Sequence, residues 1–203
     1  MTGWARGAAC AVAVGLLGGC GLSTDDEPEA IPRPTVESSA STPASTVVRP
    51  GEATENVTVF FLTTDDAGTS VEDVQRQVAL PATLGSRLDA LLAQPPDEDE
   101  RSQGIWSAIP ASATLASAPH QRGHVLIVDM PSRIYDELHG LIAQDAFAQI
   151  VYTATAIQGV ESVLFRRDGV TFEAVDGTGQ ASSRPLGRDD FPELAKRAPD
   201  LPV

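Results

Sequence analysis

Runs of β-branched and aromatic residues predict six strands between positions 56 and 175 of the chain. The first run, at 57–62, is apolar at most positions, which is typical of a central strand. The other runs are at 74–80, 114–118, 124–130, 163–165 and 170–175. Residues 119–123 separate two of these strands as a hairpin loop would, and the turn-forming dipeptide Asp168-Gly169 separates the last two.

A different spacing, with apolar residues three and four positions apart, predicts two main helices. Four leucines place an amphipathic helix over residues 82–93, which Pro95 and Pro96 end. The acidic residues 97–101 predict a turn that starts another short helix, and residues 191–198 form a further helix candidate. A long stripe predicts a single helix from about 132 to 158, with Gly159 as its stop. This stripe consists of Ile134, Leu138, Leu141, Ile142, Ala146, Ile150, Thr153 and Ile157.

The order of these elements, β-β-α-β-β-α-β-β, predicts an α+β fold. We expect an antiparallel or mixed sheet with the two main helices packed on one face. Small polar residues cap the amino ends of helices, so Asp129 or Ser132 is expected to cap the long helix predicted from about 132 to 158. Trp106, between Ile105 and Ile109, is expected to pack in the core or a loop.

The first nineteen residues have the features of an export signal. Arg6 precedes a short apolar run at 8–17, about half the length that spans a bilayer as a helix. The run ends in Leu17-Gly18-Gly19-Cys20, which resembles a lipobox, the bacterial signal for cleavage before a cysteine that receives acyl chains. We therefore predict a lipid anchor on Cys20, at the extracytoplasmic face of the cell membrane. Ordinary secretion and a cytosolic chain with an apolar start are the alternatives.

The remaining chain divides by composition into a linker, a domain and a tail. Residues 20–55 begin with the lipidated cysteine and are then acidic and rich in proline, serine and threonine. Their isolated apolar residues cannot offset the entropy of ordering, so this segment is predicted to be a disordered linker. The signal peptide is then 1–19, the domain 56–176, and a polar C-terminal extension 177–203.

Composition and charge narrow the class of partner. The 203 residues include 14 basic and 28 acidic ones, which gives a net charge of −14. Phosphates repel such a chain, so nucleic acid is excluded as a main partner, and a partner surface is expected to be neutral or basic. The two cysteines, Cys10 and Cys20, both lie in or next to the signal, so no disulfide is expected in the mature chain.

Motifs that carry known chemistry are absent from the sequence, including nucleophile elbows, phosphate-binding loops and zinc-ligand patterns. His120 and His124 are four residues apart but straddle the expected hairpin loop, so they are interpreted as surface residues, as is His139. The many carboxylates lack a context that would mark an acid–base pair. We therefore predict no catalytic residues, no metal and no cofactor.

Three stretches together resemble the GerMN domain, which is named for a sporulation and germination lipoprotein. Residues 57–62 form the first stretch, and residues 90–95, Gly104 and 108–110 form the second. The third and most specific comprises residues 148–153 with Gly159, Val160, Val163, Phe165, Asp168 and Gly169. Residues 184–186 and 189–191 also resemble the tail that follows this domain in exported lipoproteins of high-GC Gram-positive bacteria.

The resemblance implies a compact α+β domain akin to ring-building motifs, which serve as interaction modules in membrane-associated assemblies, and it implies no known enzymatic activity. Gln149, Tyr152 and Thr153 match the family signature without an assigned role, and packing on the long helix is one explanation. The Tyr152 hydroxyl is then expected to find a hydrogen-bond partner at the edge of the core.

Two functions from different classes follow. The first is a non-enzymatic, lipid-anchored module that docks an envelope or membrane protein through a sheet edge or a helix face. The second is a protein that binds a small molecule or cell-wall glycan, or a weak hydrolase, with a pocket between helices and sheet. Scarce aromatic residues count against glycan binding, because sugars stack on aromatic rings. A buried polar pocket would favour the second function.

Overall fold

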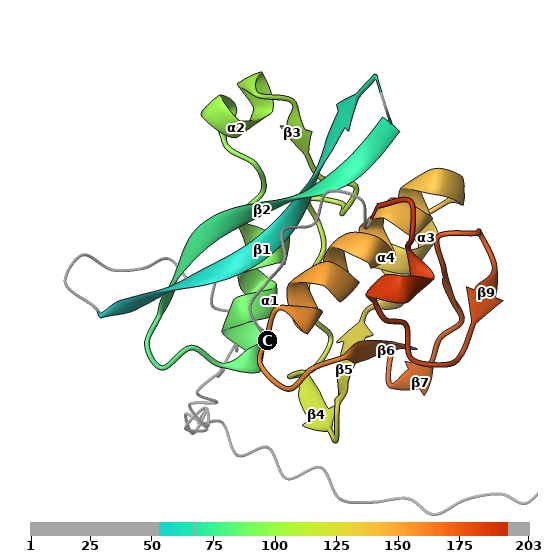
Figure 1. The fold of residues 1–203 in the computed structure, drawn as a ribbon. Coiled ribbons are helices and arrows are strands. Elements are labelled where there is room, and N and C mark those ends of the chain that lie inside the picture. The colour runs from blue at the N-terminus through green and yellow to red at the C-terminus, as the bar shows by residue number, and fades with distance from the viewer. Residues whose placement is uncertain (1–52, 67, 195–203) are drawn as a thin grey trace, which may run out of the picture. The chain divides into compact units, whose positions relative to one another are not determined.

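The computed structural model describes residues 53–66 and 68–194 (Figure 1). The predicted signal peptide, Cys20, nearly all of the linker and positions 195–198 of the last helix candidate lie outside these residues. In the described ranges, no helix is long and apolar enough to cross a membrane.

A long hairpin forms the first sheet. Strands β1 (Thr54–Asp65) and β2 (Gly68–Ala79) pair in antiparallel register from end to end. The short strand β3 (Ile105–Trp106) pairs with the other side of β1, which gives the order β2-β1-β3. The predicted central position of the first strand is therefore confirmed, while β2 begins at Gly68 rather than at the predicted residue 74.

The second sheet is mixed and has the order β4-β5-β6-β7. Strands β5 (Val125–Met130) and β6 (Ser162–Arg167) are parallel neighbours, because helices connect them in a crossover. The flanking strands β4 (His120–Arg122) and β7 (Val170–Thr171) are antiparallel to them, and β8 (Ala174–Val175) and β9 (Ala181–Ser182) form a separate pair. The predicted α+β class with antiparallel and mixed strands is confirmed, but the strands divide between separate sheets.

The hairpin before β5 differs from the prediction. Residues 114–118 are not a strand, and only the N–H of Ala116 bonds to this edge of β5, at the carbonyl of Asp129 (2.8 Å). The pairing segment is β4, which lies inside the expected loop. Gly123 adopts a φ of +59°, which permits a two-residue turn directly before β5, so the partner strand is the one next to that turn.

Two predicted helices are confirmed, and local hydrogen bonds explain where they begin. Helix α1 (Leu84–Ala93) has Thr83 as its cap, and the Thr83 and Ser86 side chains bond each other's backbone N–H groups. Helix α2 (Glu98–Ser102) begins with the same reciprocal arrangement between Asp97 and Glu100. Each capping pair satisfies two amides that a helix start leaves without partners.

The predicted long helix is wrong, because the chain breaks into α3 (Ser132–Glu137) and α4 (Gly140–Thr155). Leu138 and His139 are extended, and Gly140 begins α4 with a φ of +56°. This break ends the apolar stripe, so Leu141 and Ile142 are 73% and 55% exposed although the periodicity placed them inside.

The capping prediction at Asp129 and Ser132 is also wrong. Pro131 is the N-cap of α3 and makes no side-chain cap bond. The Asp129 carboxylate instead accepts from the N–H of Gly169 (3.0 Å) and from Ser117, while the N–H of Ser132 donates to Asp168 (3.2 Å). Both carboxylates therefore join the β6–β7 turn to neighbouring segments.

Helix α4 is the centre of the fold. Every residue from Ala146 to Ala154 is buried, and the helix contacts β1 of the first sheet and β6 of the second (Figure 1). A helix that is apolar on all sides needs covering elements on all sides. The two sheets, α1 and the segment after β8 supply this cover.

The segment after β9 contributes to this core, although the sequence marks it as polar. Leu186 forms two main-chain hydrogen bonds with Val163 of β6, and both Leu186 and Phe191 are buried. Between them lies the short 3₁₀ helix η1 (Arg188–Asp190). In the described part of the last helix candidate, residues 191–194 form a turn instead.

Replacement of Phe191 by alanine tests whether this segment is part of the domain. We expect Phe191→Ala to lower the free energy of unfolding by about 3–5 kcal/mol, because it removes a buried aromatic ring. The control Val170→Ala changes a side chain that is 70% exposed. It should change the free energy of unfolding by less than about 0.5 kcal/mol. Urea denaturation of both variants measures the difference; equal values would place Phe191 outside the cooperative unit.

Candidate functional site

Two of the three signature residues connect α4 to the middle of β1. The N–H of Phe60 donates to Thr153 Oγ1 (3.0 Å), and Gln149 Nε2 donates to the carbonyl of Phe60 (3.2 Å). Both main-chain groups of Phe60 point away from β2, toward the side on which β3 pairs only with Leu62 and Thr63. The two side chains thus replace a missing strand partner for a buried residue.

Gln149 has a further contact on its oxygen. Its Oε1 accepts from the N–H of Ala108 at 2.7 Å, so one buried amide joins β1, α4 and the segment after β3. Trp106 also holds this segment, because its indole N–H donates to Thr64 Oγ1 (3.2 Å) while its ring packs on the core. The geometry therefore gives Gln149 and Thr153 hydrogen-bonding roles inside the fold.

Tyr152, the third signature residue, is fully buried against other side chains. Its ring lies 5.6 Å from that of Phe60 and 4.8 Å from the guanidinium carbon of Arg188. Burial raises the pKa of its hydroxyl. This hydroxyl has no hydrogen-bond partner among the described residues, so the expected partner at the edge of the core is not found.

Arg188 is a half-buried cation at the end of α4. The sequence pattern did not single it out, although residues 184–186 and 189–191 on either side of it resemble the family tail. Its Nε donates to Thr155 Oγ1 (2.7 Å), and its Nη2 donates to the carbonyl of Tyr152 (3.1 Å). Burial lowers the pKa of the guanidinium. Its partners here are neutral, and no carboxylate in the described part of the chain forms an ion pair with it.

A pocket of about 950 Å³ opens beside Arg188. It is lined by residues 155–161 at the carboxyl end of α4, by residues 187–189 and by His124. Its position differs from the expected pocket between helices and sheet, since most of its wall consists of two loops.

The outer edge of β2 is a second candidate surface. The N–H of Leu80 donates to the carbonyl of Ala53. Together with the register of the hairpin, this bond shows which residues of β2 form main-chain hydrogen bonds with β1. Because these groups alternate in direction along a strand, Thr69, Val71 and Asp73 direct theirs away from β1. No strand among the described residues covers them.

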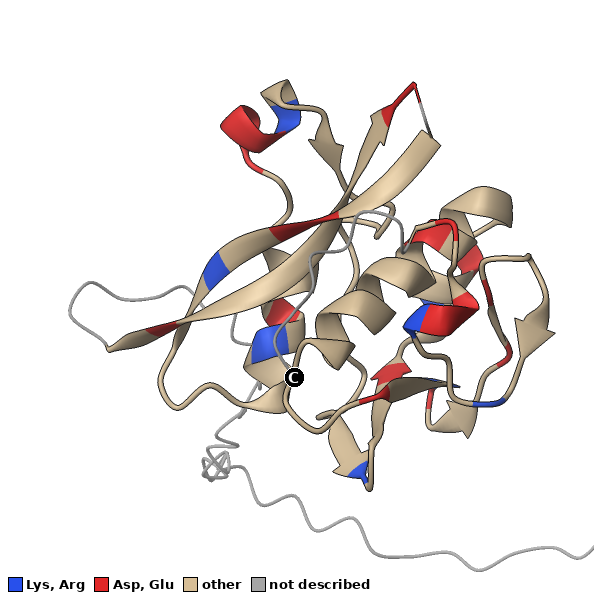
Figure 2. Ribbon diagram, viewed as in Figure 1, with Lys and Arg blue, Asp and Glu red and all other residues tan. Residues whose placement is uncertain are grey.

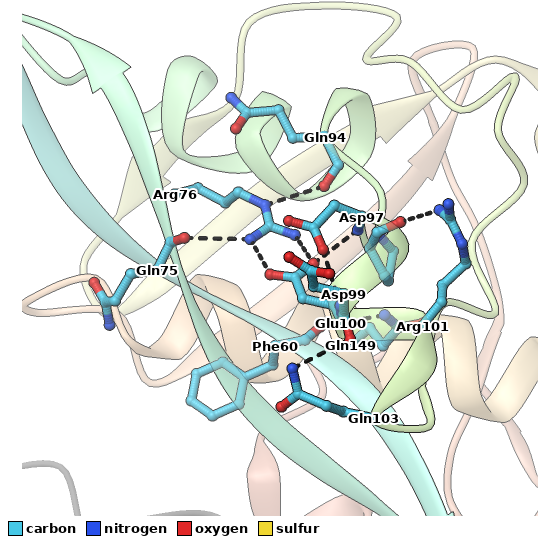
Figure 3. Close-up of polar contacts among 11 residues, drawn as sticks. Phe60, Gln75, Arg76, Gln94, Asp97, Asp99, Glu100, Arg101, Gln103 and Gln149 are labelled. Atoms are coloured by element: carbon cyan, nitrogen blue, oxygen red, sulfur yellow. Dashed lines mark hydrogen bonds and ion pairs between the residues drawn. The ribbon is translucent and has the colours of Figure 1, made fainter.

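Side chains occupy the remaining part of this edge. The carbonyl of Gln75 accepts from Arg76 Nη1 at 3.2 Å (Figure 3). The carbonyl of Gln77 accepts from the side-chain amide of Gln94. Arg76 in turn forms a bidentate pair with Glu100 of α2, at 2.6 and 2.7 Å. The part of the edge without a strand or side-chain partner is therefore confined to residues 69–73, where Thr69 and Asp73 are partly exposed and Val71 is buried.

Acidic residues surround the open part of the edge. Glu72 and Asp73 lie on the strand itself, and Asp66 is exposed in the turn before it (Figure 2). Arg76, the nearest cation on β2, is neutralised by Glu100. The edge thus combines main-chain groups that no described strand pairs with, accessible at Thr69 and Asp73, with negative charge.

The remaining candidates from the sequence lie apart from these surfaces or on their rim. His120, His124 and His139 are all exposed, and His124 lies 3.5 Å from Glu161. Within residues 53–66 and 68–194, no group of three or more histidine, cysteine, aspartate or glutamate side chains is arranged to hold a metal ion.

Comparison with known proteins identifies the family of this domain. A family model described as "Germane: Sporulation and spore germination" matches residues 58–173, which is more than half of the chain. The chain belongs to this family. The resemblance to GerMN domains is thereby confirmed, and the matched region contains Phe60, Gln149, Tyr152 and Thr153.

A solved structure supports the same fold. The tandem GerMN domains of the sporulation protein GerM from Bacillus subtilis align with a TM-score of 0.56 at 21% identity, over 68% of this chain and 46% of that one. This chain thus spans less than half of that protein. The first GerMN domain of the same protein aligns with a TM-score of 0.47 at 16% identity, over 66% and 98% of the two chains. A sequence search among curated proteins gave no significant match.

The bond between Thr153 and β1 can be tested by an isosteric substitution. Thr153→Val leaves the buried N–H of Phe60 without an acceptor, so the free energy of unfolding should fall by about 1–3 kcal/mol. Thr153→Ser keeps the acceptor and serves as the control. Hydrogen exchange measured by NMR should accelerate at Phe60 in the valine variant alone; unchanged exchange there would contradict the role given to Thr153.

The Arg76–Glu100 pair predicts a pH-dependent contribution to stability. The bond with Arg76 holds the pKa of the Glu100 carboxyl below its usual 4.5. Because the folded pKa is the lower one, this stabilisation is present above pH 4.5 and is lost as the pH falls through the folded value. Glu100→Gln should cost about 1.5–3 kcal/mol at neutral pH and much less in acid, measured by urea denaturation.

Glu72→Gln is the matched control for this experiment, because Glu72 is an exposed carboxylate on the same strand as Arg76. It should leave stability nearly unchanged at both pH values. If Glu100→Gln were equally destabilising in acid and at neutral pH, ionisation of this carboxyl would not be the source of the stabilisation.

Proposed function

We propose that this chain is a non-enzymatic, lipid-anchored interaction module, held by Cys20 at the extracytoplasmic face of the cell membrane, which docks an envelope or membrane protein. The observation that carries the docking part is the outer edge of β2 at residues 69–73, which has no strand partner among the described residues and is partly exposed at Thr69 and Asp73. An exposed strand edge recruits an extended segment of another chain through main-chain hydrogen bonds.

Charge specifies the partner further. The acidic residues beside the edge favour a strand that is neutral or basic, and they accelerate its approach at low ionic strength. Salt screens such attraction over about 10 Å at 0.1 M, so association should slow as the salt concentration rises. The Arg76–Glu100 pair and Gln94 close the far part of the edge, which limits the docked segment to a short one.

The anchor and the linker support the same function. The lipobox-like sequence before Cys20 supports attachment to a membrane, because two or more acyl chains give stable anchoring. A disordered linker over residues 21–55, as the composition predicts, would have ends about 30–35 Å apart on average and would allow the domain to search for a partner near the membrane.

In-cell crosslinking of the full-length chain, followed by mass spectrometry, tests both parts. Cys20→Ala should remove the lipid mass, shift the chain out of the membrane fraction and abolish capture of the partner. Asp73→Pro removes an N–H that points away from β1, so the hairpin keeps its own hydrogen bonds while the docking edge is blocked.

Asp73→Ala is the matched control, because it removes the same charge and keeps the N–H. We expect capture of the partner to fall by about tenfold or more with proline and only modestly with alanine. Equal capture by both variants would exclude the β2 edge as the docking site. A Cys20→Ala chain that remains at the membrane would exclude the anchor, independently of the edge.

A further inference from the structure

The pocket beside Arg188 is separate from the docking edge, since none of its lining residues belongs to β2. Its volume of about 950 Å³ lies at the upper end of the range typical of small-molecule sites. Its lining carries charges of both signs, with Arg188 positive and Glu161 and Asp189 negative. This combination indicates the chemistry of a ligand.

Arg188 is prepared to bind an anion. The bonds to Thr155 and Tyr152 fix one side of the guanidinium, and the rings of Tyr152 and Phe60 lie 4.8 and 5.2 Å from its central carbon. A fixed, partly desolvated guanidinium whose protein partners are neutral retains an unbalanced charge. A planar carboxylate is its best complement, because it accepts two parallel hydrogen bonds.

The surroundings oppose a ligand that is only an anion. The chain has a net charge of −14, and Glu161 and Asp189 both line the same pocket. The pocket also lies at the carboxyl end of α4, where the helix dipole favours positive charge. A ligand that satisfies both parts of the pocket carries a cationic group as well as a carboxylate.

We propose that this pocket binds a small zwitterion of the amino-acid type, with its carboxylate on Arg188 and its ammonium group beside Glu161 and Asp189. The side chain of His124, which lies near Glu161, forms part of the rim on the ammonium side. A dipeptide with free ends separates its two charges further than a single amino acid does, and it fills more of the volume of about 950 Å³. This site does not depend on the proposed docking edge.

The test uses L-alanyl-L-alanine as the probe and NMR backbone shifts of the chain, with Cys20→Ser to prevent lipidation, as the measurement. We expect saturable shifts concentrated at residues 155–161 and 187–189. Acetylation of the amino end or amidation of the carboxyl end should each weaken binding by about tenfold or more, because each leaves one part of the pocket unpaired. Free L-alanine, as a separate arm, should bind more weakly than the dipeptide.

Variants assign the two charges of the ligand to their partners. Arg188→Gln should abolish the preference for a free carboxylate, while Arg122→Gln, an exposed arginine outside the pocket, serves as the control. Because Arg188 also bonds within the fold, a second variant is needed that leaves its contacts intact. The double variant Glu161→Gln with Asp189→Asn should bind the free and the acetylated dipeptide equally weakly.

Each other result would overturn the proposal. Absence of saturable shifts with the wild-type chain would show that the pocket does not take this ligand. Equal binding of the free, acetylated and amidated dipeptides would show that charge does not select it. Shifts confined to residues outside the pocket would assign binding to another surface.

Discussion

The fold depends on the burial of α4 against β1. Gln149 and Thr153 satisfy both main-chain groups of Phe60, a residue without exposed surface in the middle of the central strand. A side-chain bond of this kind contributes only about 1 kcal/mol net, but leaving either group unpaired in the core costs more. Polar contacts within an apolar interface therefore help to fix the position of the helix along the strand.

This buried helix determines which positions at its two ends are exposed. At the amino end, the break at Gly140 turns the chain so that Leu141 and Ile142 leave the core. At the carboxyl end, Arg188 donates to the carbonyl of Tyr152 and closes part of the helix terminus. The same residue leaves its charge at the wall of a pocket, so a structural contact and a candidate ligand site share one side chain.

The two candidate surfaces would bind their ligands through different groups. The β2 edge offers main-chain groups of fixed geometry, and Arg76, Glu100 and Gln94 restrict it to a short acidic stretch. The pocket offers side-chain charges of both signs at a helix end. The two proposed sites could be coupled, so that the zwitterion affects binding of the docked segment. Such coupling requires that both ligands favour the same conformational change. The described structure holds them on separate elements.

The sequence by itself determined the elements whose causes are local. The apolar run of β1, the leucine spacing of α1 and the Asp168-Gly169 turn each depend on neighbouring residues, and all are found where the pattern predicts them. The lipobox before Cys20 is also a local pattern and stays a prediction. The family resemblance likewise followed from short stretches in order. Tertiary structure decided the rest, because the causes are contacts between distant residues.

Periodicity could not reveal the break at Gly140, since one left-handed residue redirects a helix without changing its apolar spacing. Isolated apolar residues such as Leu186 and Phe191 carry no periodic signal, yet β6 and α4 bury them. Gln149, Thr153 and Arg188 acquire their roles only when β1, α4 and η1 meet. The hydrogen bonds of Phe60 to Gln149 and Thr153 in the core, and those of Arg188 to Tyr152 and Thr155 beside the pocket, join residues far apart in the sequence, so no local pattern reveals them.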